Sequence, residues 1–203
     1  CENKIKKEKF LKNIGIKNPK IIPFNKIKKN LPVIKKKIFG NSSKNQKIIR
    51  HYQDIPRKKD HGYFYQKYFN FQEYGMDILN DFQGNYLHSL AKKKISMRAG
   101  DTDKAEIISS KKFLNLAKKI SSNLKHIGNL DIDFLVNKEK IYVIDLNPRF
   151  GGGYPFTHEY GFNYIKAMVE LSLKNKKKIK FKSKNNKIKK FSKGISIYKE
   201  KKL

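Results

Sequence analysis

The residues best suited to chemistry in this chain are polar side chains that alternate with apolar ones in two neighbouring segments. The four are Asp131, Asp133, Asp145 and Asn147. Residues 130–136 and 141–147 are predicted to form two strands joined by a polar turn. With a symmetric turn, Asp133 lies opposite Asp145 and Asp131 lies opposite Asn147, so all four side chains occupy one face.

This acidic face requires a cation, because like charges directly across a strand pair are unfavourable. Oxygen ligands with no histidine or cysteine beside them favour magnesium held between protein and phosphate. Arg149 and the loop Gly151–Gly153 follow at once, and a guanidinium there would stabilise charge on a moving phosphoryl group. The alternative is an ordinary acidic hairpin with Arg149 in a structural salt bridge. The chain has only 17 acids against 48 basic residues, so acids that cluster in register are unlikely to arise by chance. This favours a nucleoside triphosphate site over the alternative.

A lysine-bearing strand after Pro32 runs into the small-residue loop 40–43. Such loops can present backbone N–H and hydroxyl groups to phosphates, although this one is not a Walker A motif. Lys35, Lys36 and Lys37 are all candidates for the phosphate contact.

The segment 63–79 is predicted to be a strand, a loop and a second strand. Here Gln66–Phe69 could offer backbone groups to an adenine edge, and Glu73 could offer a carboxylate to ribose hydroxyls. An ordinary core hairpin explains the local pattern equally well. Further on, Lys94 and Arg98 share one side of a predicted strand and face either phosphate or solvent.

The strongly basic composition does not by itself indicate a nucleic-acid-binding protein. The net charge is +31, yet only four of the 48 basic residues are arginines, and nucleic-acid interfaces favour arginine for bidentate and stacking contacts. Abundant lysine, isoleucine and asparagine are what AT-rich codon usage produces. We therefore expect nucleic acid to bind only non-specifically. Where arginine is kept in a motif, as at Arg98 and Arg149, guanidinium geometry is the expected reason.

Length and composition are those of a globular protein. The 203 residues, 38% of them hydrophobic, suffice for one domain or two small subdomains. No segment approaches the roughly 20 apolar residues of a membrane span, and no signal-peptide pattern is present. Cys1 is the single cysteine, so a reducing, cytoplasmic setting is expected. Because the chain does not begin with Met, we expect upstream sequence to be missing.

Hydrophobic periodicity and turn residues predict a mixed α+β order of elements. Helices are expected over 3–14, 111–125 and 161–174, and a weakly patterned helix over 45–60. Strands are expected over 63–69, 73–79 and 86–91, the last one extending to 98, besides the acidic hairpin.

In this order the motifs resemble the ATP-grasp superfamily, most closely its carbamoyl-phosphate-synthase-like branch. The resemblance runs from about residue 3 to residue 172 and is most specific over Asp131–Gly161, with Met97–Ala105 as a second match. It implies the α+β ATP-grasp fold, in which two subdomains clasp ATP. The implied boundaries are a linker helix over 1–29, a small lid subdomain over 30–90, and a large subdomain over 91–203 with the metal site and a basic tail.

The resemblance also implies roles for single residues. Those expected to hold the nucleotide are Lys36, Gly40, Ser43, Gln66, Lys67, Tyr68, Phe69, Glu73 and Lys94. Those expected to hold magnesium or manganese are Asp133, Asp145 and Asn147. Those expected to act in catalysis are Arg149 on the γ-phosphate, with Lys36 and Arg98. Within the first set, Gly40–Ser43 is the lid loop, Gln66–Phe69 the adenine hinge and Glu73 the ribose contact.

The reaction so implied is that of an ATP-dependent, C–N bond-forming ligase. A small carboxylate takes the γ-phosphate to become an acyl phosphate, and an amine or similar nucleophile then displaces phosphate. Asp145 stands where the family has Glu, and the family's preceding N-terminal domain is absent from the chain. An N-terminal domain or partner chain is therefore expected to supply the acceptor site. The alternatives are a non-catalytic nucleotide-binding remnant, half of a split enzyme, and a basic nucleic-acid or polyanion binder.

Overall fold

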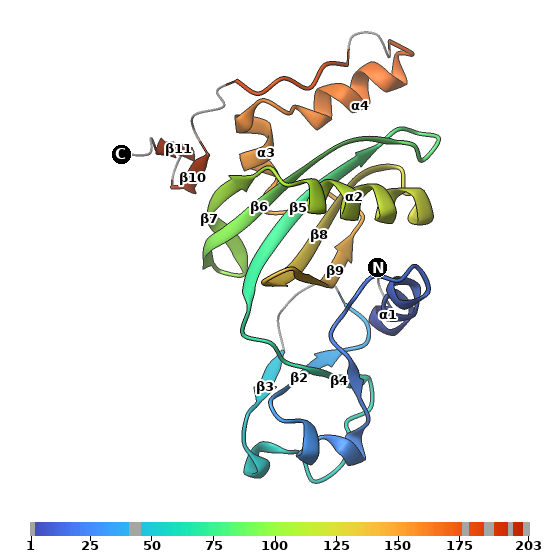
Figure 1. Ribbon diagram of the computed structural model, residues 1–203, viewed down its shortest axis with the longest axis vertical. Helices are drawn as coiled ribbons and strands as arrows, with labels where there is room; N and C mark the ends of the chain where they lie inside the picture. Colours follow the sequence, from blue (N-terminus) through green and yellow to red (C-terminus); the bar gives the residue numbers. More distant parts are fainter. Residues whose placement is uncertain (1–2, 41–45, 176–178, 185–188, 195–196, 201–203) are drawn as a thin grey trace. The chain divides into compact units, whose positions relative to one another are not determined.

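The computed structural model describes residues 3–40, 46–175, 179–184, 189–194 and 197–200. The chain divides into two compact units (Figure 1): unit 1 is Cys1–Phe71 with Leu135–Ile144, and unit 2 is Gln72–Phe134 with Asp145–Leu203. The expected boundary at residue 90 differs from this division. Strand β5 (Gln72–Asn80) pairs along its length with β6 (Tyr86–Arg98), so its hydrogen bonds tie it to unit 2.

Unit 1 is built on a four-stranded antiparallel sheet with the order β1-β4-β2-β3. Its elements are α1 (Lys4–Asn13), β1 (Ile21–Ile22), the 3-10 turns η1 (Phe24–Lys26), η2 (Lys28–Asn30) and η3 (Tyr52–Asp54), β2 (Val33–Lys37), β3 (Lys47–Ile49) and β4 (Tyr63–Lys67). A small core of Ile22, Ile27, Val33, Ile49 and Tyr65 fills one side of this sheet.

Helix α1 confirms the first predicted helix. The Asn3 side chain accepts hydrogen bonds from the N–H groups of Ile5 and Lys6, both at 3.0 Å, which satisfies donors that the first turn leaves unpaired. The segment 45–60 differs from the weakly predicted helix, since its described part holds only β3 and η3. Two β-branched isoleucines there pair with β2, and β-branched residues suit a pleated sheet better than a helix.

Unit 2 is built on the larger sheet, whose order is β11-β10-β7-β6-β5-β8-β9. Its elements besides β5 and β6 are β7 (Asp101–Ile108), α2 (Lys111–Leu124), β8 (Gly128–Asn137), β9 (Lys140–Asn147), α3 (Tyr154–Tyr160), α4 (Tyr164–Ser172), β10 (Lys190–Lys193) and β11 (Ile197–Glu200). Strands β8 and β9 are the predicted acidic hairpin. Their residues 135–144 are grouped with unit 1.

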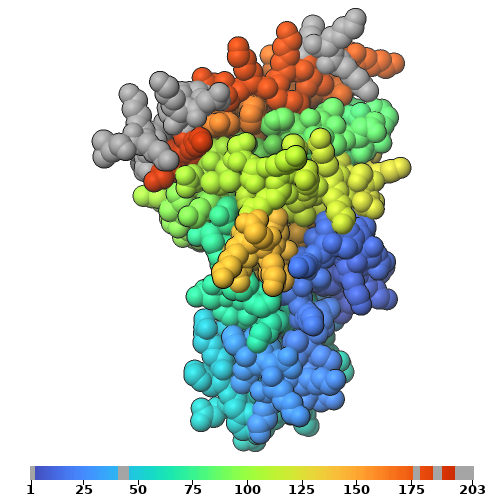
Figure 2. All heavy atoms as spheres, in the orientation of Figure 1, coloured from blue at the N-terminus to red at the C-terminus, as the bar shows by residue number. Residues whose placement is uncertain are grey.

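Helix α2 covers one face of the unit 2 sheet, toward the viewer in Figure 2. Its buried residues Phe113, Leu116, Ala117 and Ile120 recur at the three- and four-residue spacing of an amphipathic helix. The Phe113 ring lies 5.4 Å from that of Tyr74 on β5 and 5.2 Å from that of Phe134 on β8. Among the described helices, none has the length and apolar character needed to cross a bilayer.

Helices α3 and α4 pack on the opposite side through a core that combines strand and helix residues. Its members are Leu79, Leu90, Ala105, Ile107, Tyr154, Phe156, Phe162, Tyr164, Ala167 and Phe191. The prediction of a helix over 161–174 is confirmed as α4, whereas α3 was not predicted. Helix α3 starts directly after three glycines and carries a proline in its first turn, a position that proline tolerates although the sequence there resembles a loop.

Candidate functional site

The face of the unit 2 sheet that carries α3 and α4 has a polar part as well as an apolar part. Because side chains alternate along each strand, Gly75 and Asp77 lie on the same face of β5 as the core residue Leu79. Lys92 is paired with Gly75 in the β5–β6 register, and directly paired residues share a face. Side-chain alternation thus places Lys92 and Lys94 on this face.

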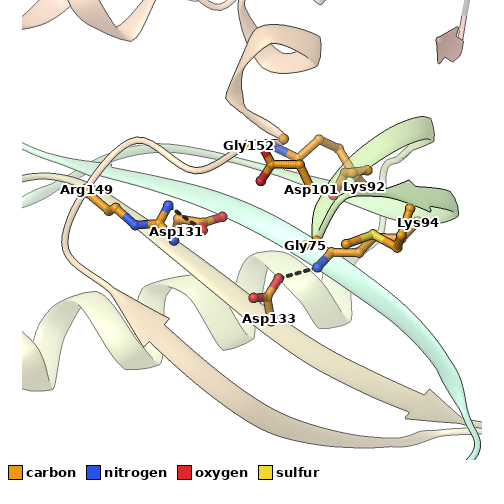
Figure 3. Close-up of a pocket in the computed structure, with 12 residues that line it drawn as sticks. Gly75, Lys92, Lys94, Asp101, Asp131, Asp133, Arg149 and Gly152 are labelled. Atoms are coloured by element: carbon orange, nitrogen blue, oxygen red, sulfur yellow. Dashed lines mark hydrogen bonds and ion pairs between the residues drawn. The ribbon is translucent and has the colours of Figure 1, made fainter. Parts of the chain in front are cut away.

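A small polar cavity of about 70 Å³ opens on this part of the sheet (Figure 3). Its twelve lining residues include three predicted site residues, Lys94, Asp133 and Arg149. They also include Asp131 of the predicted acidic face, Gly152 of the predicted glycine loop, and Lys92 and Asp101, which were given no role. Strands β5, β6 and β8, the start of β7 and the glycine loop all contribute to it. The structure therefore gathers part of the predicted site within unit 2.

Lys94 occupies the centre of the acidic group. Its Nζ lies 2.6 Å from Asp133 Oδ1 and 2.5 Å from Glu73 Oε1. Although burial opposes the charge, these two carboxylates raise the pKa of Lys94. Burial raises the pKa of Asp133, against the opposing effect of Lys94 and with further repulsion from Glu73 and Asp145. The acidic face thus does hold a cation here, and that cation is an ammonium of the chain itself.

Arg149 and Asp131 form a second, looser pair. The guanidinium Nη1 lies 3.4 Å from Asp131 Oδ2, and the Arg149 side chain is 53% exposed. Burial, followed by the repulsion of Asp133 and Asp77, raises the pKa of Asp131 to about 7, despite Lys92 and Arg149 nearby. The salt bridge named as the alternative for Arg149 is present, and it leaves half of the side chain in solvent.

The glycine loop lies directly against two carboxylates. A Cβ on Gly151 would stand 2.2 Å from the carboxyl carbon of Asp131, and one on Gly152 would stand 2.2 Å from Asp101 Oδ1. The loop sequence is therefore explained by close approach of its backbone to these acids. Asp101 lies within the Met97–Ala105 match, but the sequence analysis gave it no role in the predicted site.

A fully buried polar group lies beneath the loop. Lys92 donates to Asp77 Oδ2 and, at 2.9 Å, to Thr157 Oγ1, while the Thr157 hydroxyl donates to Asp77 Oδ2. Lys92 also packs under Gly153, where a Cβ would meet its Cε at 3.4 Å. Sequence reasoning missed this group, although an aspartate within the apolar run of residues 76–79 was a usable signal.

The predicted metal ligands Asp133, Asp145 and Asn147 all belong to unit 2, on adjacent strands β8 and β9. Asp145 is close enough to Asp133 to raise its pKa. Among the described residues, no three Asp, Glu, His or Cys side chains form a metal-binding group. Two carboxylates and an amide fit magnesium only if phosphate and water complete its coordination shell. Magnesium at nucleotide sites is usually coordinated in this way. On this ground the donor set fits, and the metal assignment stays a prediction.

Arg98 does not join the cavity. Its side chain is 63% exposed and pairs with Asp103 at 2.9 Å. Its guanidinium also donates to the Lys193 carbonyl oxygen at 3.4 Å. Its assignment as a catalytic residue therefore gains no support from the geometry within unit 2.

The remaining predicted nucleotide residues, except Glu73 and Lys94, belong to unit 1. Of the three candidate lysines on β2, Lys35 is engaged by Asp60, Lys37 is exposed, and Lys36 is 9% exposed. Lys36 Nζ donates to Gln66 Oε1 at 3.0 Å, and Gln66 in turn donates to the Pro19 carbonyl oxygen at 2.8 Å. Lys36 is thus the most buried of the three lysines, and its contact with the phosphates stays a prediction.

The hinge and lid residues are described only in part. Lys67 Nζ donates to the carbonyl oxygens of Asn30 and Leu31 at 2.9 and 3.0 Å. Arg50 lies over the ring of Tyr68, and Phe69 stacks on Phe71 at 4.9 Å. In the predicted lid loop, Gly40 is exposed with a φ of 120°. Ser43 lies outside the described residues.

The sequence profile of the ATP-grasp domain matches residues 1–153. The chain therefore belongs to the ATP-grasp family, and the predicted fold class is confirmed. No curated protein matches the chain. Assignment to the carbamoyl-phosphate-synthase-like branch rests on the motifs alone.

Solved structures of the same fold include two carboxyaminoimidazole ribonucleotide synthetases. One, in its ADP complex, is 14% identical with a TM-score of 0.70, over 84% of this chain and 51% of that chain. The other, from Aspergillus clavatus with ATP, is 14% identical with a TM-score of 0.70, over 90% and 53%. Biotin carboxylase from Campylobacter jejuni with a β-γ-ATP ligand is 18% identical with a TM-score of 0.69, over 84% and 46%. The chain thus spans about half the length of these proteins.

Proposed function

We propose that this chain is the nucleotide-binding and phosphoryl-transfer part of an ATP-dependent ligase. The observation that carries the proposal is the gathering of Asp133, Lys94 and Arg149 around one polar cavity of an ATP-grasp chain, with Asp145 close enough to Asp133 to raise its pKa. It is supported by solved relatives that are named as synthetases and a carboxylase and that hold ADP, ATP or an ATP-like ligand.

In this proposal Asp133, Asp145 and Asn147 hold magnesium or manganese. When bound, the ion supplies charge neutralisation at the phosphate oxygens. Lys94 then loses Asp133 as a partner but keeps Glu73, whose carboxylate lies 2.5 Å away. Glu73 is also the proposed ribose contact.

Arg149 is proposed to meet the γ-phosphate, because its side chain is half exposed and its guanidinium is held by a 3.4 Å contact to Asp131 and a 3.1 Å hydrogen bond to the Phe150 carbonyl oxygen. A bidentate arginine–phosphate pair is shorter and stronger than such a contact. Lys36 and the hinge Gln66–Phe69 of unit 1 are proposed to hold the phosphates and the adenine. The lid loop with Gly40 and Ser43, and a substrate or phosphate contact by Arg98, remain further proposals.

The proposed reaction transfers the γ-phosphoryl group to a small carboxylate. A carboxylate oxygen attacks the γ-phosphorus, and the bond to the β–γ bridging oxygen breaks to release ADP. An amine nitrogen then attacks the acyl carbon, the acyl–oxygen bond breaks, and the phosphate that is released takes up the proton lost by the amine. The chain's own contribution is orientation and charge stabilisation. An N-terminal domain or a partner chain is proposed to complete the acceptor site.

The test is ADP release with magnesium and ATP over a panel of small carboxylates and amines. We expect release that requires one of each, and a loss of about 100-fold or more in Arg149→Met. Arg57→Met, an exposed arginine of unit 1, is the matched control and should keep full activity. Binding of ATP without any ADP release would identify a nucleotide-binding remnant. Failure of the chain to bind ATP at all would refute the proposal.

A further inference from the structure

Two carboxylates of the cavity flank the glycine loop on consecutive residues. Asp131 lies against Gly151 and Asp101 lies against Gly152, each in the space that a Cβ would occupy. Both acids also line the cavity, and Figure 3 shows Asp101 near Gly152 and Lys92. The loop and its two acids therefore form one wall of this small polar space.

The cations around the cavity already have partners other than these two acids. Lys92 is bound to Asp77 and Thr157, and Lys94 is bound to Glu73 and Asp133. Lys193, the other ammonium at the loop, donates to the Gly152 carbonyl oxygen. These bonds leave Arg149 as the cation that faces Asp131, at 3.4 Å.

With the partner acids Asp77 and Glu73 included, five carboxylates share the four cations Lys92, Lys94, Arg149 and Lys193 around this cavity. No hydrogen bond or ion pair joins the Asp101 carboxylate to another residue of the described chain. This is unusual in a chain whose 48 basic residues far outnumber its 17 acids. Asp77 Oδ1 is buried with no hydrogen-bond partner on the same sheet face. If Arg149 turns to the γ-phosphate, Asp131 is left without a cation partner, as Asp101 already is within the described chain. Two carboxylates on one wall then require a positive ligand.

We propose that the space between Asp101, Asp131 and the glycine loop is the acceptor subsite and takes the ammonium group of a primary amine. This rests on the proposed function, because the vacated Asp131 follows from Arg149 engaging ATP. An ammonium offers three N–H donors, which suits two carboxylates and nearby carbonyl oxygens. A volume of about 70 Å³ is far below the roughly 300 Å³ or more of a pocket for a whole ligand. It admits the amino end of a substrate.

A divalent cation is the main rival for this space, and the donor set argues against it. Calcium takes six to eight oxygen ligands and magnesium needs near-octahedral geometry. Within the described residues, Asp101 and Asp131 belong to no group of three metal-binding side chains. An ammonium needs only hydrogen-bond acceptors, so two carboxylates suffice for it.

The test measures binding of ethanolamine at pH 7.5 by saturation-transfer NMR, with ethylene glycol and glycolate as neutral and anionic matches. Samples contain magnesium with a non-hydrolysable ATP analogue, or neither. We expect ethanolamine to bind and the two matched compounds, ethylene glycol and glycolate, not to bind. Asp101→Asn should weaken the affinity for ethanolamine by about tenfold, which corresponds to the loss of one charged hydrogen bond. Asp131→Asn should act in the same direction. Asp54→Asn, an exposed acid of unit 1, is the control and should bind ethanolamine like the original chain.

Nucleotide binding is recorded in the same samples, which separates this subsite from the proposed function. If the analogue does not bind but ethanolamine binds through Asp101, the ammonium site stands, while the proposed function and the acceptor role that rests on it fail. Ammonium chloride competing with ethanolamine supports recognition of the charged nitrogen. Glycolate binding in place of ethanolamine would overturn the subsite, as would ethanolamine binding that neither Asp101→Asn nor Asp131→Asn reduces. Manganese binding through Asp101 without nucleotide would overturn it in favour of a metal site.

Discussion

The buried ion pair beneath the glycine loop gives a prediction that is independent of any ligand. Lys92 is 2% exposed and Asp77 is 0% exposed, and Thr157 bonds to both. Lys92→Met keeps a similar side-chain length but leaves the Asp77 carboxylate buried without a cation. Removing one partner of a buried pair costs about 3–5 kcal/mol of unfolding free energy. We expect a loss in this range, since neither partner has access to water.

The double substitution Lys92→Met with Asp77→Leu tests the electrostatic reason. Replacing both charges by apolar groups is often neutral or stabilising, so the double variant should be more stable than Lys92→Met alone. The resulting coupling energy is expected to exceed about 1 kcal/mol, as for residues of one network. Lys93→Met is the matched control, because Lys93 is the next residue of β6 and only half-buried. It should change stability by less than about 0.5 kcal/mol.

Urea unfolding followed by far-UV circular dichroism gives the midpoints and slopes. Because the chain has two compact units, a single two-state curve is not assured. Amide hydrogen exchange in β5 and β6 therefore provides the local free energy for unit 2. A loss below about 1 kcal/mol in Lys92→Met, or a double variant less stable than both single ones, would show that the buried charges are not the cause of the instability.

Three further outcomes are expected. Burial lowers the pKa of His88 to about 4, below its unfolded value of about 6.5. The contribution of His88 to stability should therefore be full above pH 6.5 and fall by up to a few kcal/mol toward pH 4. Urea titrations of His88→Gln should show a flatter dependence of stability on pH. Gly151→Ala drives a methyl group into buried Asp131 and should cost about 1–3 kcal/mol of unfolding free energy. Gly152→Ala should cost less, because Asp101 is exposed and can move. Equal shifts of the urea unfolding midpoint in the two variants would contradict this prediction. Lys36→Met should weaken ATP binding at least about tenfold more than Lys37→Met, at the exposed lysine that follows it, as measured by calorimetry.

Elements with strong local patterns were predictable from the sequence. Helix α2 follows from apolar residues at Phe113, Leu116, Ala117 and Ile120, and the hairpin follows from alternation around Asp133 and Asp145. These signals are local, because helix and strand periods are visible in a short window. Helix α3 was not visible in this way, since its first turn joins glycines and a proline whose individual preferences are for loops.

The candidate site was only partly predictable, for a different reason. The acids of the hairpin and Arg149 could be recognised from their spacing. Lys94 binding Asp133 depends on pairing between β5, β6 and β8, and strand order cannot be read from local sequence. Asp101 was overlooked for the same reason, because only the fold brings the β6–β7 turn beside the glycine loop.

The polar face of unit 2 is proposed to bind ATP through a divalent cation. Isothermal calorimetry of ATP binding, with and without magnesium, tests it in the original chain and in Asp145→Ala. Glu139→Ala, in the turn of the same hairpin, is the control. We expect magnesium-dependent ATP binding that Asp145→Ala abolishes and Glu139→Ala retains. ATP binding of equal strength in Asp145→Ala, or ATP binding that does not depend on magnesium, would rule out a metal-dependent ATP site on this face.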